Sequence, residues 1–204
     1  MKIVLASNNA GKLAELQTLF APLGMTLVRQ SELNIPEAAE PFKTFVENAL
    51  AKARHAAQLS GLPALADDAG LCVDAFGGQP GVDTAYYATR FGYPKGDDTN
   101  VTALLEQMQG LDNRRAAMVS TLVAVRSADD PEPLIAVGRV VVQITPERRG
   151  RNGFGFDPVM FLPEFGKTFA ELPPEVKNAH SHRGRAAQAM LALMRERWLD
   201  GSAA

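Results

Sequence analysis

Two long apolar segments near the middle of the chain constrain its fold more than any other feature. Ala116–Val125 and Leu134–Ile144 are rich in Val, Ile and Leu, and they flank a polar stretch that contains turn-forming residues. This pattern predicts a long antiparallel β-hairpin. Nearer the N-terminus, we expect a strand over Lys2–Ala6, a helix over Gly11–Leu23 and a strand over Met25–Val28. A strand-helix-strand unit combined with a hairpin predicts an α/β protein with helices packed on a mixed sheet.

Three further helices are indicated by capping residues and apolar spacing. Thr44 and Glu47 fit a capping box, and the helix that they begin should end near Ser60, before a glycine. The other two helices are expected over about Asn100–Met108 and Gly184–Trp198.

Composition excludes several classes of protein. The 204 residues suit a single domain over 1–204, and the net charge of −2 gives no basic footprint for nucleic acid. Cys72 is the single cysteine, so no disulfide framework exists, and a cytoplasmic location is the simplest expectation. No apolar stretch approaches the 18 residues that a membrane-spanning helix needs, so we expect no membrane contact.

Two adjacent carboxylates, Asp67 and Asp68, follow a small apolar run. We interpret them as acids that a buried strand delivers to a turn at its end. Such a pair suits Mg²⁺, which prefers oxygen ligands, or the positioning of a water for attack. An ordinary surface turn is the alternative. Glu40, in the loop before the Thr44 helix, is free to reach a metal, whereas the capping box by itself explains Glu47.

A candidate anion-binding loop lies between the first strand and the first helix. Small polar residues and a glycine let backbone N–H groups point at an anion, and the helix N-terminus and a lysine add positive charge. An ordinary strand-to-helix turn with an Asn cap is the alternative. The loop consists of Ser7, Asn8, Asn9, Ala10, Gly11 and Lys12. Lys52 is either a further phosphate ligand or a solvated surface lysine.

Glycines alternate with aromatic residues in the segment Phe154, Gly155, Phe156 and Asp157. An exposed ring there could stack on a nucleic-acid base, which is worth about 1–3 kcal/mol, and Asp157 could accept hydrogen bonds from ring N–H groups. The alternative is the start of a strand with two core phenylalanines.

Basic and polar donors gather at the expected start of the last helix, where the helix dipole disfavours cations. This conflict suggests an anionic or carbonyl-rich partner for Lys177, His182 and Arg183. The alternative is a Ser181 N-cap with solvated basic neighbours.

Taken together and in order, these segments resemble the inosine triphosphate pyrophosphatase family. The resemblance runs from about Lys2 to Leu193 and rests on six motifs: SNNAGK (7–12), TFVENALAKA (44–53), ADDAGL (66–71), GGQPG (77–81), GFGFDP (153–158) and SHRG (181–184). The chain departs from the family pattern at Tyr86, where arginine is frequent, and at Val142 and Asn152, where glycines are common. The Tyr86 difference puts an arginine function at that point in question.

The resemblance implies an α/β fold with an elongated, curved mixed sheet and two lobes, with the active site in the cleft between them. It implies a homodimer, a requirement for Mg²⁺, and hydrolysis of ITP, dITP and XTP to the monophosphate and pyrophosphate. Two alternatives stay open. One is a related pyrophosphatase for modified pyrimidine nucleotides, and the other is a non-catalytic nucleotide sensor.

The resemblance also implies functions for individual residues. Asp68 matches the proposed proton acceptor and a metal ligand, with Glu40 as a second ligand and Asp67 as a third candidate. Residues 7–12, with Lys52, match the triphosphate-binding residues, and Ala69 stands where a substrate contact is expected. The residues that match the base-recognition set are Phe154, Gly155, Phe156, Asp157, Lys177, His182 and Arg183.

Overall fold

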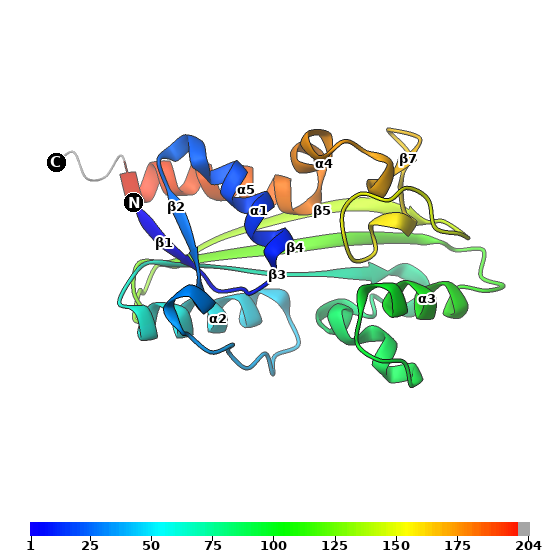
Figure 1. Ribbon diagram of the computed structural model, residues 1–204, viewed down its shortest axis with the longest axis horizontal. Helices are drawn as coiled ribbons and strands as arrows, with labels where there is room; N and C mark the ends of the chain where they lie inside the picture. Colours follow the sequence, from blue (N-terminus) through cyan, green and yellow to red (C-terminus); the bar gives the residue numbers. More distant parts are fainter. Residues whose placement is uncertain (200–204) are drawn as a thin grey trace. The chain divides into compact units, whose positions relative to one another are not determined.

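The structure, a computed structural model, describes residues 1–199 (Figure 1). Residues 200–204, the end of the predicted 1–204 domain, lie outside this part. The chain divides into two compact units that alternate along the sequence. Unit 1 contains residues 1–68, 120–138 and the segment from Ser181 onward, and unit 2 contains residues 69–119 and 139–180. A single domain with its active site in a cleft between two lobes stays a prediction.

Seven strands form one hydrogen-bonded sheet in the order β2-β1-β3-β4-β5-β6-β7. The pairs β1–β2 and β1–β3 are parallel, whereas β5–β6 and β6–β7 are antiparallel, which confirms the predicted α/β class with a mixed sheet. The strands are β1 (Lys2–Leu5), β2 (Thr26–Arg29), β3 (Ala64–Val73), β4 (Arg115–Val125), β5 (Leu134–Ile144), β6 (Met160–Leu162) and β7 (Lys167–Thr168). The α-helices are α1 (Ala10–Phe20), α2 (Phe45–Ser60), α3 (Asp97–Gln107), α4 (Pro174–His180) and α5 (His182–Met194).

The predicted elements are present, with ends shifted by a few residues. The two long apolar segments form β4 and β5, neighbours in the sheet, as expected for the predicted hairpin. Thr44 is the N-cap of α2, and its side chain accepts a hydrogen bond from the N–H of Glu47. The Glu47 carboxylate accepts from the Thr44 hydroxyl, so the capping box forms only in part. None of the helices within residues 1–199 is long and apolar enough to cross a membrane.

In unit 1, helices cover both faces of the sheet (Figure 1). Side chains alternate along a strand, so Ile3 and Leu5 pack in one cluster with residues of α1 and α5, and Val4 packs in another with α2. The face of α2 toward the sheet consists of alanines, which let the helix approach the strands closely. These buried alanines are Ala49, Ala53, Ala56 and Ala57.

One prediction about β3 is wrong. The two acids were expected at a turn, but β3 runs without interruption from Ala64 to Val73, so Asp67 and Asp68 lie inside a strand. Gly70 does not adopt a positive φ and keeps the strand extended. The apolar residues that follow it continue the pattern of a buried strand. The pair is therefore held by sheet geometry and not by a turn.

In unit 2, a core cluster forms from residues of β3, β4, β5 and α3, together with Phe156 and Phe169. Asn100 of α3 is buried, and its amide bridges two backbone groups of the preceding segment. It accepts from the Ala88 N–H at 2.8 Å and donates to the Ala85 carbonyl at 3.2 Å.

Helix α5 approaches the sheet closely at Gly138 of β5. A Cβ at this position would lie 1.9 Å from the His182 carbonyl oxygen and 2.5 Å from the Ala186 nitrogen. Both are backbone atoms of α5, so they cannot move aside as a side chain tip would. A glycine is required here for the helix to dock.

We therefore expect Gly138→Ala to lower the free energy of unfolding by about 1–3 kcal/mol, the usual cost of overpacking a core. Val137→Ala, at the exposed neighbouring position on the same strand, is the control and should change stability little. Urea unfolding of the two variants checks this. Equal stability of both would mean that α5 has room to shift.

Candidate functional site

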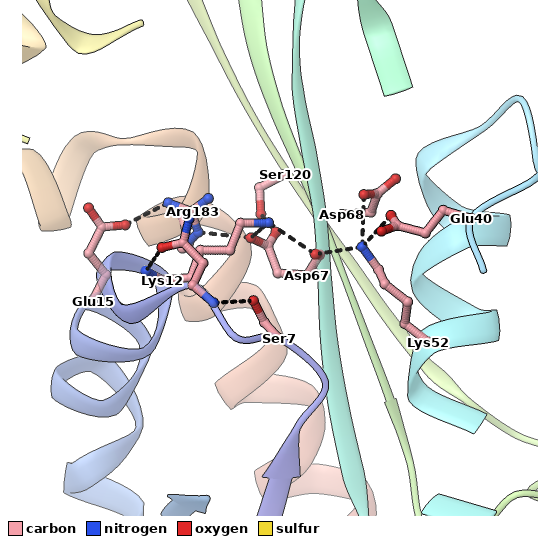
Figure 2. A network of polar contacts seen from close by, with 10 residues as sticks. Ser7, Lys12, Glu15, Glu40, Lys52, Asp67, Asp68, Ser120 and Arg183 are labelled. Atoms are coloured by element: carbon pink, nitrogen blue, oxygen red, sulfur yellow. Dashed lines mark hydrogen bonds and ion pairs between the residues drawn. The ribbon is translucent and has the colours of Figure 1, made fainter. Parts of the chain in front are cut away.

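Asp67 and Asp68 are buried neighbours on β3, and their side chains point to opposite faces of the sheet. Figure 2 shows Lys12 and Arg183 on one side of the strand and Lys52 and Glu40 on the other. The α1 and α5 face therefore receives Asp67, and the α2 face receives Asp68. All of these side chains belong to unit 1.

Asp67 is held by three donors from three elements. Its carboxylate accepts from the Ser120 hydroxyl of β4 at 2.6 Å and from Arg183 Nε of α5 at 2.9 Å. Lys12 Nζ of α1 lies 3.1 Å from Oδ2. Both carboxylate oxygens are therefore engaged. Arg183 also donates to Glu15 of α1 at 2.6 Å, which ties α5 to α1.

The charges of this network set the protonation states. Burial alone would raise the pKa of Asp67, but Lys12 and Arg183 outweigh it and hold that pKa well below its usual range. Burial alone would lower the pKa of Arg183, but the carboxylates of Asp67 and Glu15 outweigh it and raise that pKa. Burial lowers the pKa of Lys12, and Asp67 offsets this only in part. Asp67 is thus a permanent anion that anchors two cations.

Asp68 has a different environment. Its Oδ1 accepts from Lys52 Nζ at 2.9 Å, and the same ammonium donates to Glu40 Oε2 at 2.8 Å. Its Oδ2 is buried and has no hydrogen-bond partner within residues 1–199. A buried carboxylate oxygen without a donor is costly, on the order of 1–3 kcal/mol. This atom therefore marks a position where another group is needed.

The pKa of Asp68 is shifted in the opposite direction to that of Asp67. Burial raises the pKa of Asp68, and the charge of Lys52 offsets that effect only in part. For Lys52, burial would lower the pKa, but Asp68 and Glu40 outweigh it and raise that pKa. Two adjacent acids in one strand therefore differ in chemistry because they face different helices.

The two lysines converge on a single backbone atom. Lys12 Nζ and Lys52 Nζ each donate to the Asp67 carbonyl oxygen at 3.2 Å. The Leu65 carbonyl pairs with β1 through the Ala6 N–H, and the carbonyl two residues later points to the same side, beyond the end of β1. Two ammonium groups therefore meet at the open edge of β3, a geometry suited to a polyphosphate.

The predicted anion-binding loop begins α1. Asn9 is the N-cap and accepts from the Lys12 N–H at 3.0 Å, and Ser7 Oγ accepts from the Asn9 N–H at 3.2 Å. The N–H groups of Ala10 and Gly11, in the first turn, have no acceptor within the described chain. Both alternatives from the sequence are thus combined here, because the loop is an Asn-capped turn that still offers N–H donors.

The Asn8 side chain is directed elsewhere. Its Nδ2 donates to Glu37 Oε1 at 3.0 Å, which links the loop to the segment that carries Glu40.

In unit 2, Lys177 and Asp157 form a buried ion pair of 2.6 Å. Lys177 Nζ also lies 4.7 Å from the centre of the Phe154 ring, and Asp157 accepts from the Phe154 N–H at 2.9 Å. The Gly155 N–H donates to Asp97 of α3 at 2.9 Å. Phe156 is part of the core, so its ring is not available for stacking on a base.

The prediction of a donor cluster at the start of the last helix is only partly correct. Ser181 is the N-cap of α5, as its type suggested, and the next two residues, His182 and Arg183, begin that helix. Lys177 lies in the last turn of the separate helix α4, where the dipole favours a cation. Internal carboxylates compensate Lys177 and Arg183, so their charges alone do not require an external partner.

The predicted base-recognition residues belong to both units. Phe154, Asp157 and Lys177 lie in unit 2, whereas His182 and Arg183 lie in unit 1. Ala69 follows Asp68 on β3 and is half-buried. A common base pocket stays a prediction.

Sequence reasoning missed three residues of these networks. Glu15 and Ser120 hold Arg183 and Asp67 in unit 1, and Asp97 holds the Gly155 backbone in unit 2. None of the three belongs to a sequence motif that indicates a functional site. A signal for Glu15 existed in its spacing from Lys12, since residues three apart share a helix face.

The residues of unit 1 fit a divalent cation at Glu40 and Asp68. Within residues 1–199, no group of three or more His, Cys, Asp and Glu side chains forms a metal cage. Mg²⁺ needs no such cage, because it uses one or two carboxylates, waters and substrate phosphates. The partnerless Oδ2 of Asp68 supplies an oxygen ligand that no protein donor occupies. The network holds three cationic side chains and four carboxylates: Lys12, Lys52 and Arg183, and Asp67, Asp68, Glu15 and Glu40. A bound divalent cation would offset this excess of negative charge and so favour the binding of an anionic substrate.

Comparisons with known proteins show which family the chain resembles. The chain matches the model of the Ham1 family over residues 3–193. A Paracidovorax citrulli (strain AAC00-1) protein called dITP/XTP pyrophosphatase is 80% identical over 198 residues, which cover 97% of this chain and 100% of the relative. A HAM1 protein structure from Coxiella burnetii is 42% identical, with a TM-score of 0.88, covering 96% of this chain and 99% of that one. A Mycobacterium abscessus dITP/XTP pyrophosphatase structure is 39% identical, with a TM-score of 0.71, covering 96% and 100%.

Removing one partner of the Asp67 network should destabilise the protein, because it leaves a buried charge unpaired. Arg183→Met leaves the buried carboxylate of Asp67 and the partly buried carboxylate of Glu15 without their charged partner from α5, so we expect the free energy of unfolding to fall by about 3–5 kcal/mol. Arg197→Met, which removes an exposed arginine paired with Glu132, is the control and should have a small effect. Thermal and urea unfolding of both variants tests this. A similar small loss in both would show that the buried pair adds little.

Proposed function

The chain belongs to the Ham1 family, and from this premise we propose that it hydrolyses dITP, XTP and ITP to the nucleoside monophosphate and pyrophosphate. The relatives named dITP/XTP pyrophosphatase support this substrate class. The observation that carries the proposal is the convergence of Lys12 and Lys52 beside the partnerless oxygen of Asp68. A cationic cradle next to an acid is what attack on a phosphoanhydride requires.

Lys12, Lys52 and the loop donors hold the β and γ phosphates. The free N–H groups of Ala10 and Gly11 lie at a helix N-terminus, which favours phosphate. Lys12 is fixed by Asp67, so the position of its charge is set before substrate arrives. Little reorganisation is then needed during the reaction, and positioning with electrostatics supplies most of the rate enhancement.

Glu40 and Asp68 hold a divalent cation, and Mg²⁺ is the ion that suits two carboxylates and a polyphosphate. When bound, the metal neutralises charge on the phosphates. Asp67 is left out of this ligand set because Ser120, Arg183 and Lys12 already occupy its oxygens.

Asp68 orients the attacking water and accepts its proton. The water oxygen forms a bond to the α-phosphorus, and the bond from that phosphorus to the bridging oxygen breaks. Pyrophosphate leaves with the electron pair of that bond. Asp68 suits this task because its carboxylate is buried and lies beside Lys52, which holds the phosphates.

Purine selectivity is assigned to Phe154, Asp157 and Lys177, with contributions from His182 and Ala69. The Phe154 ring is half-buried and lies against the Lys177 ammonium, and we assign stacking on the base to this ring. Lys177 donates toward a 6-keto oxygen, which adenine lacks. A site built on such hydrogen bonds can reject the wrong base by about 10⁴-fold.

Two further properties belong to this proposal. The enzyme is a homodimer, which the exposed apolar residues of β5 support: Ile135, Val137 and Val141, with Arg139 between the last two. It is a cytoplasmic enzyme of nucleotide metabolism that cleanses the nucleotide pool, with no nucleic-acid or membrane partner.

A substrate panel tests the proposed function. Purified protein with Mg²⁺ is incubated with ITP, dITP, XTP, GTP, ATP and dUTP, and the products are identified. Monophosphate and pyrophosphate from the first three would support the proposal. Preference for a pyrimidine would favour a related house-cleaning pyrophosphatase, and binding without turnover would favour a nucleotide sensor.

We expect Asp68→Asn to fold normally but to lower turnover of dITP by at least about 10²-fold, the scale of a positioned acid-base group. Asp130→Asn in the β4–β5 connection removes another buried carboxylate and is the control, with turnover close to that of the wild type. Steady-state kinetics on both variants checks this. Near-normal turnover of folded Asp68→Asn would remove Asp68 from the mechanism.

Lys52→Met should tighten Mn²⁺ binding in the absence of nucleotide by about tenfold or more. The ammonium lies within 2.9 Å of both carboxylates, so it competes with a metal for them. The same variant should bind triphosphate more weakly. Mn²⁺ titration followed by electron paramagnetic resonance measures the first effect. Unchanged affinity would mean that the metal binds elsewhere.

A further inference from the structure

The loop that carries Glu40 lies along one face of α2. Residues 34–44 form neither helix nor strand, and they lead directly into this helix. Asn48, Lys52 and His55 of α2 occupy positions i, i+4 and i+7, so they share one helix face. Each contacts the loop. Their partners, in the same order, are Phe42, Glu40 and Pro36.

These contacts show that the loop runs antiparallel to the helix. His55 Nε2 lies 3.0 Å from the Pro36 carbonyl oxygen, and Lys52 binds Glu40 at 2.8 Å. Both contacts are partly exposed, so water competes with them. They are therefore weak restraints on the loop backbone.

Asn48 makes the third contact and differs from the other two. It is 2% exposed, and its amide engages both backbone groups of Phe42. Its Oδ1 accepts from the Phe42 N–H at 3.0 Å, and its Nδ2 donates to the Phe42 carbonyl at 3.2 Å. This two-point contact fixes the orientation of the peptide as well as its distance from α2. Breaking it would leave buried polar groups unpaired.

The contact through Lys52 is a weak hold on Glu40 when a cation binds. A cation at Glu40 and Asp68 would compete with the ammonium for the same two carboxylates, which would loosen the tie from Lys52 to the loop. The Asn48 contact involves the loop backbone and not the carboxylate, so it persists in both states. It acts two residues from Glu40.

We propose that Asn48 is a positioning residue for the metal site. By clamping the Phe42 backbone, it keeps the Glu40 carboxylate within reach of Asp68 before and after a metal binds. This inference rests on the proposed function, because it takes Glu40 and Asp68 as the metal ligands. Residues that orient metal ligands usually contribute about 10–100-fold to metal affinity.

The test is Mn²⁺ binding to the whole protein without nucleotide, followed by electron paramagnetic resonance. We expect Asn48→Ala to weaken the affinity about tenfold. Asn100→Ala is the matched control. Asn100 is also 2% exposed and also bridges an N–H and a carbonyl, but in unit 2. It should lower the unfolding temperature in a similar way and leave Mn²⁺ affinity unchanged.

Asn48→Thr keeps one hydroxyl in place of the two-point amide and should give intermediate affinity. If Asn48→Ala does not fold, the Mn²⁺ affinity of Asn48→Thr is the deciding measurement. Mn²⁺ affinity within twofold of the wild type in a folded Asn48 variant would overturn the inference. An equal loss of affinity in Asn100→Ala would overturn it too, because the effect would then follow general stability.

Glu40→Gln separates this inference from the proposed function. If Glu40→Gln weakens Mn²⁺ binding and the Asn48 variants do not, the metal site stands and only the positioning function fails. If Glu40→Gln leaves the affinity unchanged, the metal site itself is placed wrongly. Raising the Mg²⁺ concentration should restore the turnover of Asn48→Ala more than that of Asn100→Ala, which is destabilised away from the metal site.

Discussion

The alternation of side chains along β3 is the constraint on which the rest of the unit 1 site depends. Because consecutive residues of a strand point to opposite faces, Asp67 and Asp68 cannot share one environment. Asp67 receives three donors and becomes a fixed structural anion. Asp68 receives one shared lysine and keeps a buried oxygen without a partner. The structural function of Asp67 and the proposed catalytic function of Asp68 therefore both follow from strand geometry.

Asp67, the structural acid, fixes the cations that lie near Asp68, the reactive acid. Lys12 and Arg183 are cations in a region of low polarity, and their positions would be diffuse without a buried counter-charge. Asp67 supplies that charge from the strand, while Glu15 and Ser120 complete the network. Such internal pairing has a limited effect on net stability, but it fixes geometry. An enzyme that acts on polyphosphates benefits because its positive charges are already in place.

The sequence predicted local structure well because caps and periodicity are local signals. Thr44 was identified as an N-cap from its own neighbourhood, and the N-cap at Ser181 was one of two alternatives drawn from its neighbourhood. The pairing of charges was not predictable in the same way, since Arg183 and Asp67 lie 116 residues apart. Lys177 was misplaced for this reason, because its partner Asp157 lies on another segment. The strand through Asp67 and Asp68 was shortened because two acids and a glycine usually mark a turn.

The open edge of β3 has a consequence for solubility. β1 pairs with β3 only as far as Leu65, so the Asp67 carbonyl has no partner strand and lies on an unpaired edge of β3. Unpaired strand backbone is a template for association with another chain. The ammonium groups of Lys12 and Lys52 cover that carbonyl. The two lysines that are proposed to bind substrate thus also hinder the pairing of β3 with a strand of another chain.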